Sequence, residues 1–100
     1  MKATTIEEII TPLKEKKQLF FRDFGVISMG VFGSFAAGEQ TALSDIDIVI
    51  EMEKEKKTLH NFLKLKRLLE DEFGRPVDLG FEHTLKPAVR EKIKGRVIYV

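Results

Sequence analysis

The sequence predicts an α/β or α+β protein in which helices flank a small mixed β-sheet. Segments with apolar residues at helical spacing alternate along the chain with short runs of β-branched and aromatic residues, which is the pattern of helices packed on a sheet. A chain of 100 residues is long enough for one hydrophobic core and too short for two. We therefore expect residues 1–100 to form a single domain.

The N-terminal quarter is predicted to be helical. A Thr at position 4 or 5 and a Glu at position 7 or 8 offer a capping box, and apolar residues then recur at helical spacing. Pro12 follows Thr11, which predicts a break there and a second helical segment capped by Thr11. Gly25 is expected to end that segment in the left-handed conformation.

Two strands are predicted on either side of a loop. The stretch 26–32 is nearly all apolar, which fits a strand buried on both faces, and Gly30 within it indicates close packing against another backbone. The stretch 46–52 is rich in isoleucine, which favours a second strand. The charged residues 51–57 carry mixed signs and are expected to form a solvated strand end and loop.

The C-terminal half continues the alternation. A helix is predicted over 58–73, with Thr58 as its cap and Gly74 as its stop. A short strand is expected at 77–81, then a final helix over 85–94 and a last strand or packed tail at 96–100.

The chemistry of the chain is concentrated where the second strand begins. Asp45 and Asp47 are two residues apart, so on a strand both carboxylates point to the same side, roughly 6.6 Å apart along the backbone. Two ionised carboxylates at that separation repel each other unless a cation lies between them. Mg²⁺ is the usual ion for oxygen ligands that act beside substrate phosphates.

Gly33 and Ser34 lie directly after the first strand and suggest a phosphate site. A glycine at a strand end lets the backbone turn sharply and approach a ligand, and the following N–H groups can point at an anion. The Ser34 hydroxyl adds a donor at the same place. A short helical turn over 35–38 would add its dipole to the site.

The Gly-Ser pair at 33–34, ten intervening residues and Asp-Ile-Asp at 45–47 together resemble the signature of the DNA polymerase β-like nucleotidyltransferase superfamily. In a chain this short, GSFAAGE followed by SDIDIVIE is similar to the minimal nucleotidyltransferases, which are antitoxins paired with HEPN toxins. The resemblance implies the polymerase β-like fold, two Mg²⁺ ions, and ATP or another nucleoside triphosphate as substrate. Ala37 departs from the pattern, because many of these sequences have Arg there.

Asp78 is a polar residue inside the short apolar strand at 77–81. By itself the pattern fits an edge-strand Asp facing water as well as it fits a ligand. A strand paired beside Asp47 would lie only about 4.8 Å away, and the resemblance implies a third carboxylate at this point. We therefore expect Asp78 to join Asp45 and Asp47 as a metal ligand and to take the proton of the acceptor.

Other site classes are disfavoured. The glycines are not followed by the Gly-Lys-Ser/Thr of a P-loop. Ser34 is not expected to be a nucleophile, because neither His60 nor His83 has the context of a catalytic triad. A net charge of +1 gives no indication of direct nucleic-acid binding. With no Cys, no long apolar run and no signal-peptide pattern, we expect a cytoplasmic protein without membrane contact.

Three functions are compatible with these residues. The first, which the resemblance implies, is an antitoxin enzyme that silences its HEPN partner by adenylylating a tyrosine. The second is a non-catalytic module that neutralises its partner by contact alone, and Ala37 is the residue that favours it. The third is an enzyme that transfers a nucleotide to a small molecule without any partner protein.

Overall fold

A computed structural model of the chain describes residues 2–100. They form a four-stranded mixed sheet with the strand order β3-β2-β1-β4. β1 (Val26–Phe32) pairs antiparallel with β2 (Ile46–Met52) on one side and with β4 (Ile98–Tyr99) on the other. β3 (Val77–Phe81) runs parallel to β2. The predicted mixed sheet is therefore confirmed.

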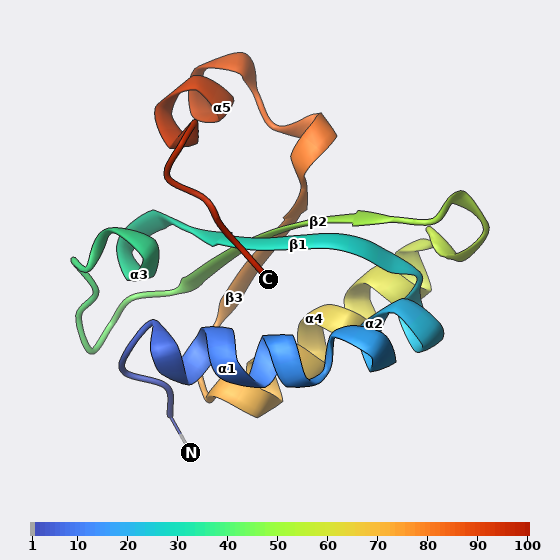
Figure 1. Ribbon diagram of the computed structural model, residues 1–100, viewed down its shortest axis with the longest axis horizontal. Helices are drawn as coiled ribbons and strands as arrows, with labels where there is room; N and C mark the ends of the chain where they lie inside the picture. Colours follow the sequence, from blue (N-terminus) through green and yellow to red (C-terminus); the bar gives the residue numbers. More distant parts are fainter. Residues whose placement is uncertain (1) are drawn as a thin grey trace.

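The helices divide between the two faces of the sheet (Figure 1). α1 (Glu7–Glu15), α2 (Lys17–Phe24) and α4 (Leu59–Phe73) lie along one face. α5 (Pro87–Ile93) stands over the opposite face, and α3 (Gly33–Ala37) is a short turn beyond the end of β1. Two 3₁₀ turns, at Lys54–Lys56 and Glu82–Thr84, complete the chain.

Side chains alternate between these two faces along β2. Ile46, Ile48 and Ile50 are fully buried in the main core with the three long helices. Val49 is also buried but lies outside that core cluster, on the face below α5. The even-numbered residues of β2 therefore stabilise the fold, and Asp47 is left on the other face.

The predicted caps of the first helix and of α4 are present, but the predicted break at Pro12 and the cap at Thr11 are wrong, since both residues lie inside α1. The Glu8 carboxylate accepts hydrogen bonds from the backbone of Thr4 and Thr5, and Thr58 caps α4. Gly25 adopts φ +68° as expected. Pro12, however, lies inside α1, and the break comes at Lys16. A proline in the second turn removes only one helix hydrogen bond, and buried neighbours such as Leu13 hold the helix together across it.

Three further expectations need correction. β1 is not buried on both faces, because Ile27 is 57% exposed. Gly30 packs closely, but against side chains and not against another backbone as predicted. A β-carbon there would lie 3.0 Å from the Tyr99 ring and closer still to Val97. The final helix is shorter than predicted and begins at Pro87.

None of the helices formed by residues 2–100 has both the length and the apolar character needed to cross a bilayer.

Candidate active site

Asp47 of β2 and Asp78 of β3 are direct partners in the parallel ladder. Paired residues on neighbouring strands project to the same face and are about 4.8 Å apart across the sheet. Asp45 immediately precedes β2, two residues before Asp47. The structure therefore brings all three predicted carboxylates to the same end of the sheet, on the face opposite the long helices.

The surroundings of Asp47 disfavour the charge on its carboxylate. Partial burial, followed by the neighbouring charges of Asp78 and Asp45, raises the pKa of Asp47 from 3.8 to about 6. Asp45 and Asp78 are both exposed. A bound cation would relieve this repulsion and lower the pKa of Asp47 again.

The chemistry of the donor set fits Mg²⁺, since three carboxylates supply only oxygen ligands. Within residues 2–100, no three acidic or histidine side chains already stand close enough together to share one ion. Asp45 and Asp78 are exposed, so their side chains can rotate toward a cation bound at the half-buried Asp47.

Gly33 provides the wall against which Asp47 packs. It has φ +73°, a conformation that favours glycine, and a β-carbon there would lie 2.9 Å from the carboxyl carbon of Asp47. Phe32, the residue before it, is paired with Asp47 across the β1–β2 ladder. Ser34 follows within α3 and is half-buried. The predicted phosphate residues and the predicted metal ligands are thus adjacent.

Arg75, which was not among the predicted site residues, supports this arrangement. Its side chain is only 5% exposed. The guanidinium donates hydrogen bonds to the backbone carbonyls of Ala3, Thr41, Ala42 and Ser44. It also lies over the ring of Phe35 in α3, 5.1 Å from the ring centroid. Arg75 therefore joins α3 to the loop that leads into Asp45, and the one sequence signal was a charged residue between Gly74 and Pro76.

An open pocket of about 730 Å³ extends from the Gly-Ser turn. One wall is formed by α3 and the residues around it, including Gly33, Ser34 and Ala37. The other is formed by residues 92–98, the returning segment, which runs from the last turn of α5 into β4. The three aspartates do not line this pocket, but Asp47 touches its edge through Gly33. The pocket is large enough for part of a nucleotide.

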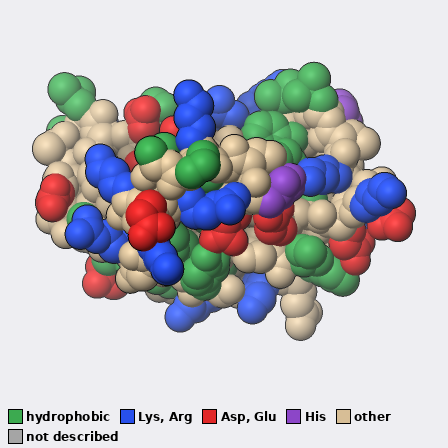
Figure 2. Space-filling view, turned by 90° about the horizontal axis from the view of Figure 1, so that it is seen from above, with side chains coloured by type: hydrophobic (Ala, Val, Ile, Leu, Met, Phe, Trp, Pro, Cys, Tyr) green, Lys and Arg blue, Asp and Glu red, His purple; other side chains and the backbone are tan. Residues whose placement is uncertain are grey.

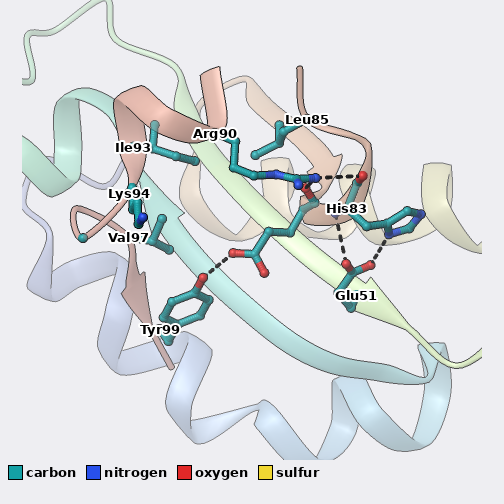
Figure 3. A pocket seen from close by; sticks show the side chains of 10 residues that line it. Glu51, His83, Leu85, Arg90, Ile93, Lys94, Val97 and Tyr99 are labelled. Atoms are coloured by element: carbon teal, nitrogen blue, oxygen red, sulfur yellow. Dashed lines mark hydrogen bonds and ion pairs between the residues drawn. The ribbon is translucent and has the colours of Figure 1, made fainter. Parts of the chain in front are cut away.

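A second cavity, of about 500 Å³, lies on the same side of the sheet (Figure 3). None of the five predicted site residues lines it. His83 bonds to Glu51 in this cavity, 2.6 Å from Nδ1 to Oε1, and the Tyr99 hydroxyl donates to Glu82. His83 therefore pairs with Glu51 in a different cavity from Ser34.

A mixed sheet with paired aspartates beside a Gly-Ser turn defines a nucleotidyltransferase. The sequence matches the family described as nucleotidyltransferase domain over residues 6–100, and the chain belongs to that family. Protein adenylyltransferase MntA of Thermococcus cleftensis is 37% identical over 100 residues, which is 100% of both chains. A candidate protein adenylyltransferase of Methanocaldococcus jannaschii is 37% identical over 97 residues, covering 96% of this chain and 98% of the other.

Solved structures agree with this assignment. A candidate minimal nucleotidyltransferase superposes with a TM-score of 0.80 at 31% identity, covering 98% of each chain. A toxin–antitoxin complex solved with AMP-PNP shares the fold, with a TM-score of 0.67 at 20% identity over 86% of this chain and 70% of that one. The resemblance to minimal nucleotidyltransferases of the polymerase β-like superfamily is confirmed.

Proposed function

We propose that this chain is a Mg²⁺-dependent protein adenylyltransferase that moves AMP from ATP onto a tyrosine hydroxyl of a HEPN-type toxin and so acts as its antitoxin. The observation that carries the proposal is the direct pairing of Asp47 with Asp78 beside the tight turn at Gly33. The relatives named as protein adenylyltransferases and the toxin–antitoxin complex of the same fold support the choice of a protein acceptor.

Each residue has a defined task in this reaction. Ser34 and the backbone at Gly33 would bind the outer phosphates of ATP, which orients the α-phosphorus toward the aspartates. Asp45, Asp47 and Asp78 would hold the metal. Two Mg²⁺ ions, when bound there, would supply charge neutralisation for the triphosphate and activation of the acceptor oxygen.

The transfer itself exchanges one bond for another. The acceptor oxygen bonds to the α-phosphorus while the bond from that phosphorus to the oxygen bridging to the β-phosphate breaks, so pyrophosphate leaves and AMP stays on the acceptor. The Asp78 carboxylate takes the acceptor's proton, because it is exposed and directly beside Asp47. Asp47 remains ionised and fixed against Gly33 throughout.

The test combines labelled ATP, Mg²⁺ and the protein encoded by the neighbouring gene. We expect label on the partner with the wild-type chain and with Asp71→Asn, an exposed α4 control, and none with Asp47→Asn. A partner whose tyrosines are replaced by phenylalanine should stay unlabelled. Label on free nucleotide or a small molecule alone, without a partner protein, would contradict a protein acceptor.

A second candidate is an antitoxin that neutralises its partner by contact alone, and Ala37 favours it. An alanine in the wall of the pocket beside Ser34 offers no charge to a triphosphate. Co-expression with the toxin separates the two functions, because growth restored by Asp47→Asn as fully as by the wild type indicates contact, and growth restored only by the wild type indicates catalysis.

A further inference from the structure

We propose that Lys92, in the last turn of α5, and Arg96, between α5 and β4, bind the phosphates of the incoming nucleotide and supply the positive charge that Ala37 lacks. This inference rests on the proposed function, since it assigns further ligands to the same nucleotide. Lys92, Arg96 and Ala37 line the same pocket as Gly33 and Ser34. Lys92 and Arg96 are 55 or more positions after Ala37 in the sequence, yet they face the same pocket.

The charge of the pocket is set by few residues. Lys92 and Arg96 contribute two positive charges and Glu39 contributes one negative charge, so its lining has a net charge of +1. Within residues 2–100, neither cation forms a hydrogen bond or an ion pair through its side chain with another described residue, and both are exposed. Their charges are thus available to an anionic ligand.

The position of these cations relative to the aspartates suits a triphosphate. The pocket meets Asp47 at Gly33, so a nucleotide whose α-phosphate lies beside the aspartates can extend its outer phosphates past Ser34 into the space between α3 and the returning segment. Lysine and arginine there can donate charge-assisted hydrogen bonds to those phosphates. Arg96 can do so with two parallel N–H groups.

The returning segment distributes its basic residues between two cavities. Ile93, Gly95 and Val97 line both, whereas Lys92 and Arg96 line only the pocket at the Gly-Ser turn and Lys94 lines only the cavity of Glu51 and His83 (Figure 3). Figure 2 looks onto this side of the molecule and shows basic, acidic and hydrophobic side chains interspersed over it. Attraction of a nucleotide must therefore come from individual side chains in the pocket and not from a broad basic surface.

The test compares nucleotide binding by calorimetry in the presence of Mg²⁺. We expect Lys92→Ala combined with Arg96→Ala to weaken ATP binding by about 10- to 50-fold, because two charge-assisted contacts are lost. AMP has no outer phosphates, so its affinity should change by less than about threefold. Lys94→Ala, a matched change in the same segment, should leave both affinities unchanged.

A rescue variant separates a phosphate contact from a structural effect. Adding Ala37→Arg to the double variant places a cation back in the same pocket and should restore at least about tenfold of the lost ATP affinity. In transfer assays, the double variant should raise the KM for ATP and leave kcat within about threefold. A proportional loss of AMP and ATP binding, or no rescue by Ala37→Arg, would overturn the assignment.

The result also distinguishes this inference from the proposed function. If the wild type binds ATP with Mg²⁺ and the double variant binds it equally well, Lys92 and Arg96 are not phosphate ligands and the enzyme assignment stands. If the wild type itself takes up no ATP, the proposed function fails first, and this inference fails with it.

Discussion

The carboxylate of Asp47 occupies the space that a side chain on Gly33 would need. Asp47 lies in β2, whereas Gly33 is the first residue of α3, directly after β1. Gly33 has φ +73°, which places its backbone against that carboxylate. The phosphate turn and the metal-binding strand are therefore fitted to each other, and a change in one is expected to disturb the other.

Gly33→Ala should destabilise the protein and abolish Mg²⁺-dependent ATP binding. An alanine there adopts an unfavourable left-handed conformation, which costs about 1 kcal/mol, and its β-carbon also collides with Asp47. Gly38→Ala is the matched control, because Gly38 has φ +74° and open space around it. Chemical denaturation and calorimetry should show the strain in both variants and the loss of ATP binding only in the first.

Asp47→Asn should remove activity and increase stability at pH 7.5. The folded-state pKa of Asp47 is about 6 and its ordinary value is 3.8, so the folded protein holds this proton more tightly than the unfolded chain between about pH 4 and 6. The contribution of Asp47 to the free energy of unfolding therefore falls as pH rises through that window. After allowance for solvent screening, we expect the asparagine to gain about 1 kcal/mol above pH 6 and nothing near pH 4.

Denaturation curves at pH 4, 5, 6 and 7.5 measure this difference. Asp71→Asn, at an exposed position of α4, should show no such pH dependence. A wild type that is more stable than Asp47→Asn at pH 7.5 in the absence of metal would show that the charge on Asp47 is compensated within the fold.

Mg²⁺-dependent ATP binding should weaken as pH falls below about 6. Asp47 is protonated there because of its burial and its acidic neighbours, and a proton competes with the cation for the same oxygens. Titrations with Mg²⁺ from pH 5 to 8 should place the midpoint near the pKa of Asp47. Chelation of the metal at pH 7.5 should give the same loss of binding, and an unchanged affinity at pH 5 would contradict this role for Asp47.

Arg75→Ala should destabilise the protein by about 2–4 kcal/mol, because it leaves several backbone carbonyls without a donor. It should also weaken ATP binding by releasing the loop before Asp45. Arg67→Ala, at an exposed position of α4, is the control. If thermal unfolding shows equal stability for the two variants, Arg75 does not hold the loop.

The sequence pattern predicted which helices and strands form, but not where each helix breaks or ends. Val26–Phe32 was predictable as a strand because it is nearly all apolar, and Ile46–Met52 because its β-branched residues favour extended backbone. The break at Pro12 was predicted wrongly, because buried contacts keep α1 intact across the proline. Local propensity is a weak signal wherever tertiary packing acts on the same residues.

By itself, the sequence determined the family, the mixed sheet and the aspartates at 45 and 47, because these depend on residue type and short spacing. Only the tertiary structure decided that Asp78 pairs with Asp47, that Arg75 lies beneath the loop and that Lys92 and Arg96 face the Gly-Ser turn. The physical reason is that these contacts join segments 30 or more residues apart, and only the register of the sheet and the path of the chain after β3 bring them together.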